Sequence, residues 1–344
     1  MKKIKVAVNG CGRIGRAVIN QSLERDDLEI VAVNDLSEPK DIAYLLNYDS
    51  VYGKRVEKFS FDEINQFLVV GDKKIKYLQE KDPKDLPWAD LDIDVVVEST
   101  GVFNTFESSS LHIEAGAKRV VLSAPSKDEP KDQSNATVLM GVNEEALETC
   151  SISSNASCTT NAVSPLISIL QEKIGIEKAI LNTVHAYTIS QSVVDSFNKK
   201  NPRLGRAAAD NIVPTTTGAA TATGKVITSL EGKFDGIALR VPVIAGSVAD
   251  ITFISSRDTT VEEVNQALIE GSKDNRWDGI FAVTDEPLVS SDIKNWLVGS
   301  VADLSFTKVV DGNLVKVLAW YDNEAGYAHT LIEHVVKTGS YVQK

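Results

Sequence analysis

Short apolar runs, each ending in small or polar residues, recur through the first half of the chain. The run Ile4 to Asn9 ends at a glycine-rich turn and passes into a helical pattern. Similar runs lie at 30–33, 95–97 and 120–122. Strands that are buried on both faces of a parallel sheet have this composition. The segment 1–156 is therefore predicted to be one α/β domain of the doubly wound type.

The second half of the chain has a different pattern. Stretches such as 236–241 and 248–253 alternate apolar and polar side chains, which indicates strands of an antiparallel sheet with one covered face. The segment 157–323 is therefore predicted to be an α+β domain with a largely antiparallel sheet. From Gly326 onward apolar residues follow helical spacing, and a closing amphipathic helix is expected over 324–344.

Length and charge are consistent with two domains and narrow the choice of partners. A chain of 344 residues exceeds the roughly 250 to 300 residues at which single cores stop growing. A net charge of -12 argues against nucleic acid or an anionic membrane as partner. Lys5 and Asn9 interrupt the first apolar run before it reaches the length of a signal-peptide core, so a cytoplasmic protein is expected.

The glycine turn after the first strand has the spacing of a dinucleotide-binding loop. Gly10 permits the tight turn, Gly12 lets a pyrophosphate approach the backbone, and Gly15 lets the helix pack on the strand. Asp35 follows Gly15 by twenty residues, at the end of the next predicted strand. Its carboxylate suits the adenosine ribose hydroxyls and repels an added phosphate, which favours NAD over NADP. The alternative is that the glycines form an ordinary turn and that Asp35 only caps an element.

Cys158 is the candidate nucleophile. It lies just before an apolar helical pattern, with Ser or Asn residues suited to the N-cap, so it is expected in the first helical turn. The helix dipole and free N–H groups there stabilise a thiolate, lower its pKa and can hold an oxyanion. Cys11 and Cys150 have settings typical of structural cysteines. Their spacing is not that of a zinc site, and no metal is expected.

A thiolate nucleophile needs a partner for proton transfer. His185 closes an apolar run and is expected to project from a strand end. The other three histidines, His112, His329 and His334, lie in predicted helices and are expected at the surface. His185 is therefore the preferred base, although the sequence alone leaves the choice open.

Taken together, these motifs closely resemble the phosphorylating glyceraldehyde-3-phosphate dehydrogenase family, nearly end to end. The blocks that carry the resemblance are Asn9 to Arg16, Asn34 to Leu36, Tyr48 to Val51, Ser99 to Gly101, Ser123 to Pro125, Ser154 to Asn161, His185 to Thr188, Pro214 to Ala220, Arg240 to Pro242 and Trp320 to Glu324.

The resemblance implies roles for individual residues. A Cys158 thiolate attacks the aldehyde, His185 serves as base, hydride passes to NAD, and inorganic phosphate releases the acyl group from a thioester. The implied NAD contacts beyond the glycines are Arg13, Ile14, Asp35, Lys81, Ser123 and Asn323. The implied ligands of the attacking phosphate are Ser157, Thr159, Thr217 and Gly218, and those of the substrate phosphate are Thr188 and Arg240.

The resemblance also implies a homotetramer whose C-terminal helix returns to the nucleotide domain. The sequence departs from the family pattern at several positions. Ala162 replaces a second cysteine, and Leu204 stands where a phosphate-binding arginine is usual. Ile189-Ser190 and Ser196-Phe197 also differ, and the latter pair leaves some use of NADP open.

Two other functions remain as alternatives. One is an erythrose-4-phosphate dehydrogenase, whose relatives share the cysteine block and hydrolyse the thioester. The other is a non-catalytic binding or regulatory protein, against which the intact thiol, histidine and anion-site residues argue.

Overall fold

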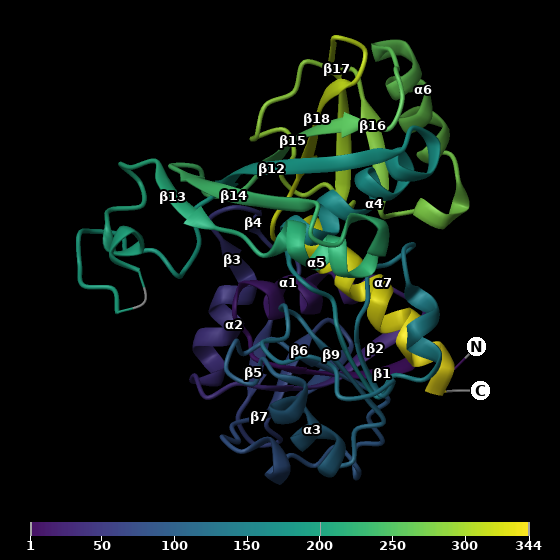
Figure 1. The fold of residues 1–344 in the computed structure, drawn as a ribbon. Coiled ribbons are helices and arrows are strands. Elements are labelled where there is room, and N and C mark those ends of the chain that lie inside the picture. Colours follow the sequence, from purple (N-terminus) through teal and green to yellow (C-terminus); the bar gives the residue numbers. More distant parts are fainter. Residues whose placement is uncertain (1, 200, 343–344) are drawn as a thin grey trace. The chain divides into compact units, whose positions relative to one another are not determined.

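The computed structural model describes residues 2–199 and 201–342, and the chain divides into two compact units (Figure 1). Unit 1 contains the described residues of 1–138, 143–156 and 331–344, and unit 2 contains 139–142 and the described residues of 157–330. These limits differ from the expected domains at two places. The segment 139–142 and the first turns of the C-terminal helix both group with unit 2.

Unit 1 is built on a mostly parallel sheet. Its strand order in the described residues is β10-β11-β9-β8-β1-β2-β7-β6-β5, in which β10 to β7 are parallel and β6 and β5 are antiparallel. The elements of unit 1 are β1 Ile4–Asn9, α1 Arg13–Ser22, β2 Leu28–Asn34, α2 Pro39–Asn47, β3 Tyr48–Asp49, β4 Gly53–Lys54, β5 Ser60–Asp62, β6 Phe67–Val70, β7 Lys73–Leu78, β8 Val95–Glu98, α3 Phe106–Glu114, β9 Arg119–Leu122, β10 Asn135–Thr137 and β11 Ile152–Ser154.

The continuous apolar runs form the centre of this sheet, as predicted. Every residue of β8 is buried, and β9 is buried apart from its first residue. Val96 and Val120 pack in one hydrophobic cluster with Trp88 and Phe106. Burying a large apolar side chain of this kind stabilises the fold by about 1.5–3 kcal/mol.

The order of the strands places a switch point at β1. The chain passes from β1 to β2 on one side, and later returns to β8 on the other side. Ligands of open α/β sheets bind in the crevice outside the carboxyl ends of the strands at such a point. In unit 1 those ends carry Asn9, Asn34 and Glu98.

Unit 2 has a largely antiparallel sheet, as predicted. Its order in the described residues is β13-β14-β12-β15-β18-β17-β16, and only the pairs β12·β14 and β16·β17 are parallel. The elements of unit 2 are α4 Cys158–Lys173, β12 Ile176–Ala186, β13 Val213–Thr216, α5 Ala219–Val226, β14 Phe234–Val241, β15 Ser247–Ser255, α6 Val261–Gly271, β16 Phe281–Thr284, β17 Ser300–Val310, β18 Leu314–Tyr321 and the first turns of α7 Ala325–Val342.

The alternation seen in the sequence reflects one covered face of this second sheet. Along β15 buried and half-buried residues alternate without a break, and β18 follows the same pattern after its first residue. The helix α4 packs against β17 and β18 and contacts both α5 and α6. Residues 159–170 of α4 are all buried, so this helix forms the centre of the unit.

The C-terminal part of α7 packs within unit 1. There His334 is fully buried, with Nε2 2.8 Å from Ser153 Oγ and Nδ1 3.0 Å from Asn155 Oδ1. The expectation that this histidine lies at the surface was wrong. A helix that is covered along most of its circumference buries polar positions too, and they are tolerated when hydrogen-bonded.

This burial makes stability depend on pH. Burial lowers the pKa of His334 from 6.5 to about 3. Between these values the unfolded chain binds a proton that the folded chain excludes, so stability falls as the pH falls below about 6.5. The contribution of His334 to the free energy of unfolding should be about 2 kcal/mol smaller at pH 5 than at pH 7.

We therefore expect the substitution His334→Gln, which keeps hydrogen-bonding capacity, to narrow the difference in unfolding free energy between the two pH values by about 2 kcal/mol. Urea titrations of wild type and variant at both pH values measure this difference. An unchanged difference in the variant would contradict the assignment. His185 contributes with the same sign and stays in both proteins.

Candidate functional site

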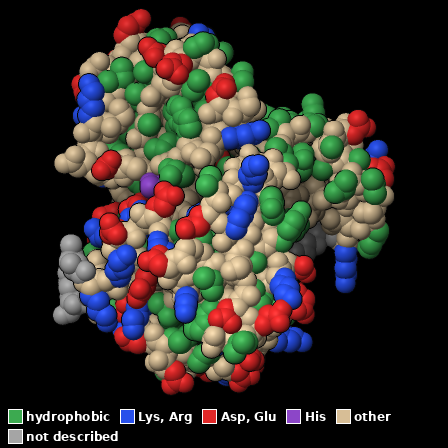
Figure 2. All heavy atoms as spheres, turned by 180° about the vertical axis from the view of Figure 1, so that it is seen from behind, with side chains coloured by type: hydrophobic (Ala, Val, Ile, Leu, Met, Phe, Trp, Pro, Cys, Tyr) green, Lys and Arg blue, Asp and Glu red, His purple; other side chains and the backbone are tan. Residues whose placement is uncertain are grey.

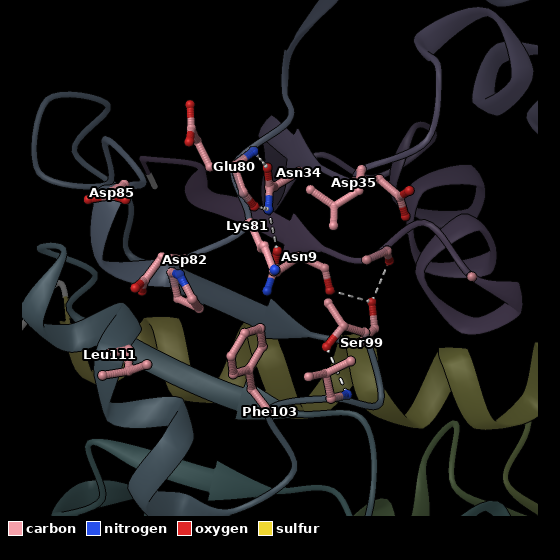
Figure 3. Close-up of a pocket in the computed structure, with 16 residues that line it drawn as sticks. Asn9, Asn34, Asp35, Glu80, Lys81, Asp82, Asp85, Ser99, Phe103 and Leu111 are labelled. Atoms are coloured by element: carbon pink, nitrogen blue, oxygen red, sulfur yellow. Dashed lines mark hydrogen bonds between the residues drawn. The ribbon is translucent and has the colours of Figure 1, made fainter.

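A large cavity lies at the carboxyl ends of the parallel strands in unit 1 (Figure 3). Its volume is about 830 Å³, within the range of small-molecule and cofactor sites. The residues that line it are Asn9, Gly10, Gly12, Asn34, Asp35, Leu36, Glu80, Lys81, Asp82, Pro83, Asp85, Ser99, Thr100, Val102, Phe103 and Leu111.

The glycine loop forms one wall of this cavity and requires its glycines. Gly10 has φ 97°, and a Cβ there would lie 2.6 Å from the backbone nitrogen of Thr100. A Cβ on Gly15 would lie 1.9 Å from the carbonyl oxygen of Gly10. Around Gly12, by contrast, no described atom beyond the adjoining backbone lies within 4 Å of the Cβ position. Gly12 is also the N-cap of α1 and has no side-chain cap among the described residues, so the helix N-terminus is open to an anion.

Asp35 is held at the cavity by two backbone donors. The amide of Cys11 donates to Asp35 Oδ2 at 2.7 Å, and the amide of Ser37 donates to Oδ1 at 2.9 Å. Each carboxylate oxygen keeps further acceptor capacity. The aspartate is thus fixed in position and can still accept from a ribose hydroxyl. The side chains of Asn34, Asp35 and Lys81 lie around the same opening in Figure 3.

A buried polar network supports the cavity and was not foreseen from the sequence. Glu98 Oε2 accepts from Asn9 Nδ2 at 2.6 Å and lies 3.0 Å from His112 Nε2, while Oε1 accepts from the amide of Thr100 at 2.8 Å. Trp88 Nε1 donates to His112 Nδ1 at 3.0 Å. Indole nitrogen is only a donor, so His112 carries its proton on Nε2. The surface position expected for His112 was wrong, because the network holds it in the interior.

The remaining predicted NAD contacts lie outside the lining of this cavity, as far as the described residues show. Arg13 donates to Asp49 and lies over the ring of Tyr52. Although burial opposes it, the Arg13 guanidinium holds the pKa of Asp49 below its usual value. Ile14 and Gly15 continue α1, and Ser123 follows β9 with its amide bonded to the Glu98 carbonyl.

Asn323 belongs to unit 2 and is buried there. Its Oδ1 accepts from the amide of Gly246 at 3.2 Å and from Ser247 Oγ at 3.1 Å. These two bonds orient the amide, and the NH2 group is the part left to donate to a ligand.

The first turn of α4 presents the thiol. The helix begins at Cys158, and its N-cap is Ser157, whose Oγ accepts from the amide of Thr160 at 3.1 Å. The predicted helix start is confirmed. Ala156, two residues earlier, has φ 54°, a conformation that a non-glycine residue seldom adopts. Such strained positions cluster at functional sites.

The structure brings the predicted base to the thiol. His185 lies one residue before the end of β12, and its Nε2 is 3.4 Å from Cys158 Sγ. On the other side of the ring, Nδ1 lies 2.6 Å from the carbonyl oxygen of Ala186 and 2.8 Å from Arg240 Nη1. The parallel pairing of β12 with β14 places His185 directly opposite Arg240.

The resting thiol has a different pKa from the one expected at a helix start. Burial raises the pKa of Cys158, and Arg240 and hydrogen bonds from Thr159 lower it only in part. Burial and the Arg240 charge together lower the pKa of His185 to about 3. Burial thus outweighs the lowering of the thiol pKa that the helix start was expected to give.

Tyr321 joins the two elements that carry the pair, and no motif had assigned it this role. Its hydroxyl lies 2.9 Å from Thr159 Oγ1 on α4 and 2.7 Å from Thr183 Oγ1 on β12. Its ring meets the ring of His185 edge-on, with centroids 5.8 Å apart. The signal in the sequence is the block Trp320 to Glu324, which contains Tyr321 and is one of those that carry the family resemblance.

The other predicted anion ligands have distinct settings in unit 2. Thr188 Oγ1 lies 3.0 Å from Ser190 Oγ, and Thr217 Oγ1 accepts from the amide of Ala219 at 3.2 Å. Gly218 is the N-cap of α5, and no described atom beyond the adjoining backbone lies within 4 Å of its Cβ position. The Thr159 hydroxyl lies 2.9 Å from the Tyr321 hydroxyl.

Leu204 lies between two arginines, Arg203 and Arg206, and one of them forms an ion pair. Arg206 Nε donates to Asp195 Oδ2 at 3.0 Å, and both side chains are exposed. Leu204 is half-buried, whereas Arg203 is exposed. The guanidinium of Arg206, two residues after Leu204, is thus already paired with Asp195.

Within 2–199 and 201–342, no group of three or more His, Cys, Asp or Glu side chains could hold a metal ion. Across the same residues, no helix has the length and apolar character needed to cross a bilayer.

Comparison with known proteins identifies the family. The NAD binding domain of glyceraldehyde 3-phosphate dehydrogenase matches residues 4–106, and the C-terminal domain of the same family matches residues 157–323. The chain belongs to the glyceraldehyde 3-phosphate dehydrogenase family. It is accordingly an NAD-dependent dehydrogenase of that type, and unit 1 contains the NAD-binding domain of the family.

Relatives match over nearly the whole chain. The glyceraldehyde-3-phosphate dehydrogenase of Streptomyces coelicolor is 45% identical over 98% of this chain and 99% of its own length. That of Geobacillus stearothermophilus is 44% identical over 96% of both chains, and that of Mycolicibacterium smegmatis is 45% identical over 98% of both.

In this dehydrogenase the Tyr321 hydroxyl should fix the positions of Cys158 and His185 relative to each other. We expect Tyr321→Phe to keep the ring packing, to lower kcat by about tenfold and to cost about 1–2 kcal/mol of stability, because it leaves buried hydroxyls without their bridge. Steady-state kinetics and urea unfolding measure the two effects.

The matched control is Ser164→Ala on the same helix. Ser164 Oγ lies 3.1 Å from Thr223 Oγ1, so this substitution also removes a buried bridge between two elements, away from the thiol. It should cost similar stability and leave kcat unchanged. Equal losses of kcat in both variants would show that Tyr321 acts only through stability.

Proposed function

We propose that this chain oxidises glyceraldehyde 3-phosphate with NAD and inorganic phosphate, through a thioester on Cys158, to give 1,3-bisphosphoglycerate and NADH. The observation that carries the proposal is the group of three side chains in unit 2. A thiol at a helix start, a histidine 3.4 Å away and an arginine paired with that histidine supply a nucleophile, a base and an anion ligand.

Each residue has a step in this reaction. Arg240 and Thr188 bind the substrate phosphate, and the Cys158 thiolate attacks the aldehyde carbon. The backbone amides of the first turn of α4 stabilise the oxyanion that forms. The protonated His185 gives its proton to this oxyanion to form a hydroxyl. The neutral imidazole then takes that proton back as the C–H bond breaks and the thioester forms.

The cofactor site fits NAD. Gly12 leaves open space at the helix N-terminus for a pyrophosphate, and the fixed carboxylate of Asp35 suits an adenosine ribose. Bound NAD supplies the hydride acceptor. Lys81 lines the same cavity, whereas Arg13, Ile14, Ser123 and Asn323 are proposed as contacts through the family resemblance.

The second half of the reaction consumes phosphate. We assign Ser157, Thr159, Thr217 and Gly218 to the attacking phosphate, since hydroxyls and backbone amides are its usual ligands. Attack on the thioester carbon breaks the C–S bond and returns Cys158 as thiolate. An acyl phosphate is the product.

The distinguishing experiment is an initial-rate assay with glyceraldehyde 3-phosphate and with erythrose 4-phosphate, each with and without phosphate. We expect NADH formation from glyceraldehyde 3-phosphate to fall at least about tenfold when phosphate and arsenate are omitted, because hydrolysis of the thioester has the higher barrier. Equal turnover without either anion would overturn the proposal and favour the erythrose-4-phosphate dehydrogenase alternative. That alternative is tested because Leu204 stands where the family pattern has a phosphate-binding arginine.

A binding or regulatory role without catalysis is tested by the same protein. Stoichiometric alkylation of Cys158 by iodoacetate should abolish dehydrogenase activity. A folded protein with no activity towards either aldehyde would support the non-catalytic alternative.

We also propose that the chain assembles with itself as a homotetramer. The segment between β12 and β13 carries four strongly exposed apolar side chains, Ile189, Val193, Val194 and Phe197, with exposed fractions of 98%, 82%, 70% and 91%. Hydrophobic side chains gather over this projecting segment in Figure 2. Contiguous apolar surface of this kind is typical of an interface between protein chains.

We expect Val194→Asp to reduce the mass measured by light scattering below that of four 37.3 kDa chains, because a charge would be buried unpaired at the interface. The matched control is Val56→Asp, since Val56 is fully exposed in unit 1. The control should keep the mass of the wild type. A wild-type protein that is monomeric would contradict the assembly.

A further inference from the structure

The side chain of Glu98 is buried beside the cofactor cavity, and its carboxylate is saturated with donors. Oε2 accepts from Asn9 Nδ2 at 2.6 Å and from His112 Nε2 at 3.0 Å, and these two nitrogens lie 3.4 Å apart, as two donors to one oxygen do. Oε1 accepts from the amide of Thr100 at 2.8 Å and from the hydroxyl of the same residue. A carboxylate has about four lone-pair sites, so these donors fill it.

The direction of each bond follows from two groups of fixed character. Indole is only a donor, and Trp88 Nε1 donates to His112 Nδ1 at 3.0 Å, so the His112 proton lies on Nε2 and points to Glu98. A carboxylate is only an acceptor, so Asn9 turns its NH2 group to Glu98. The side-chain oxygen of Asn9 therefore faces the other way.

The network continues along the wall of the cavity. Asn9 Oδ1 accepts from Asn34 Nδ2 at 2.7 Å. Asn34 Nδ2 also donates to the carbonyl oxygen of Glu80 at 2.9 Å, and Asn34 Oδ1 accepts from the amide of Glu80 at 2.8 Å. All three residues line the cavity, and Figure 3 shows them joined by these bonds. One buried carboxylate thus decides how the amide side chains at the ends of β1 and β2 are turned.

We infer that Glu98 and His112 are positioning residues for NAD, which hold the wall of the cavity in its binding shape through the side chains that they hydrogen-bond. Among the described residues, neither of the two lines the cavity itself. The inference rests on the proposed function, which assigns this cavity to NAD. It adds that the affinity for NAD depends on a buried carboxylate and a buried imidazole that lie behind the cavity wall.

An isosteric change at Glu98 exposes this dependence. Glu98→Gln keeps the shape of the side chain and puts an NH2 group in place of one oxygen. In the place of Oε2 the NH2 group meets the donors Asn9 and His112, and in the place of Oε1 it meets the amide of Thr100. A donor faces a donor in both orientations. A residue that lines the cavity must therefore move or lose its partner.

His112 offers a pair of variants of similar volume. His112→Gln keeps an N–H group that can donate to Glu98, whereas His112→Met has no donor and leaves one acceptor site of a buried carboxylate unfilled. If donation to Glu98 is what positions the wall, glutamine should preserve the affinity for NAD and methionine should not.

Titration calorimetry of the full-length chain with NAD tests the inference, together with steady-state kinetics. We expect Glu98→Gln and His112→Met to raise the Kd for NAD about tenfold, since one mispaired buried group is worth this much. His112→Gln should stay within about threefold of the wild type. At saturating NAD, kcat should change by less than about twofold, because the network acts on binding and the reacting side chains belong to unit 2.

The matched control is Asn47→Asp, an isosteric change at another buried pair of hydrogen bonds in unit 1. Asn47 Nδ2 donates to the carbonyl oxygen of Phe59 at 2.8 Å, and Oδ1 accepts from the amide of Phe59 at 2.7 Å. The aspartate sets an acceptor against that carbonyl oxygen, so the variant should lose stability in urea and keep the Kd for NAD of the wild type.

Three results would overturn the inference. One is a wild-type Kd for NAD in folded Glu98→Gln and His112→Met. Another is an equal loss of affinity in Asn47→Asp, which would show that the network acts only through stability. The third is an equal loss in His112→Gln and His112→Met, because the donor would then have no part in it. If Glu98→Gln does not fold, the two His112 variants decide.

Asp35→Ala separates this inference from the assignment of the cavity. It removes a side chain that is assigned directly to the ribose of NAD. Unchanged affinity for NAD in Asp35→Ala would contradict the assignment of the cavity. A loss of affinity in Asp35→Ala, with wild-type affinity in Glu98→Gln and His112→Met, would keep the cavity and remove the positioning role alone.

Discussion

The register between β12 and β14 is the constraint on which the chemistry of unit 2 depends. Parallel pairing puts His185 opposite Arg240, and both side chains then lie on the same face of the sheet. A slip of one residue would turn one of them to the other face. The helix α4 completes the arrangement, because its first turn brings Cys158 to the Nε2 side of the imidazole.

Several buried contacts hold α4 and β12 together beside this pair. Tyr321 bridges α4 and β12 through two threonine hydroxyls, and its ring supports the imidazole. These groups are held in the interior, where unmade hydrogen bonds cost about 1–3 kcal/mol each. The same burial lowers the pKa of His185 and raises that of Cys158.

In unit 1 a buried network of hydrogen bonds likewise fixes the side chains around the cofactor cavity. The carboxylate of Glu98 accepts from Asn9, Thr100 and His112, and two of these partners line the cavity. Because Trp88 fixes the tautomer of His112, the donor to Glu98 is also fixed. A cavity that is held in shape before binding costs less conformational entropy when the ligand arrives.

The sequence by itself determined the elements and most candidate residues, because those depend on local order. Apolar runs predicted β1, β8 and β9, alternation predicted β14 and β15, and the N-cap pattern placed Cys158 at a helix start. The glycine spacing and Asp35 likewise follow from a single strand, turn and helix.

Only the tertiary structure decided what depends on contacts between distant segments. It paired His185, rather than another histidine, with Cys158, and it buried His112 and His334, which spacing had placed at the surface. It also reversed the expected direction of the Cys158 pKa shift, because desolvation depends on everything packed around the sulfur and the helix start is only one part of that. Arg240 beside Nδ1 is likewise a product of sheet register, which no local pattern in the sequence encodes.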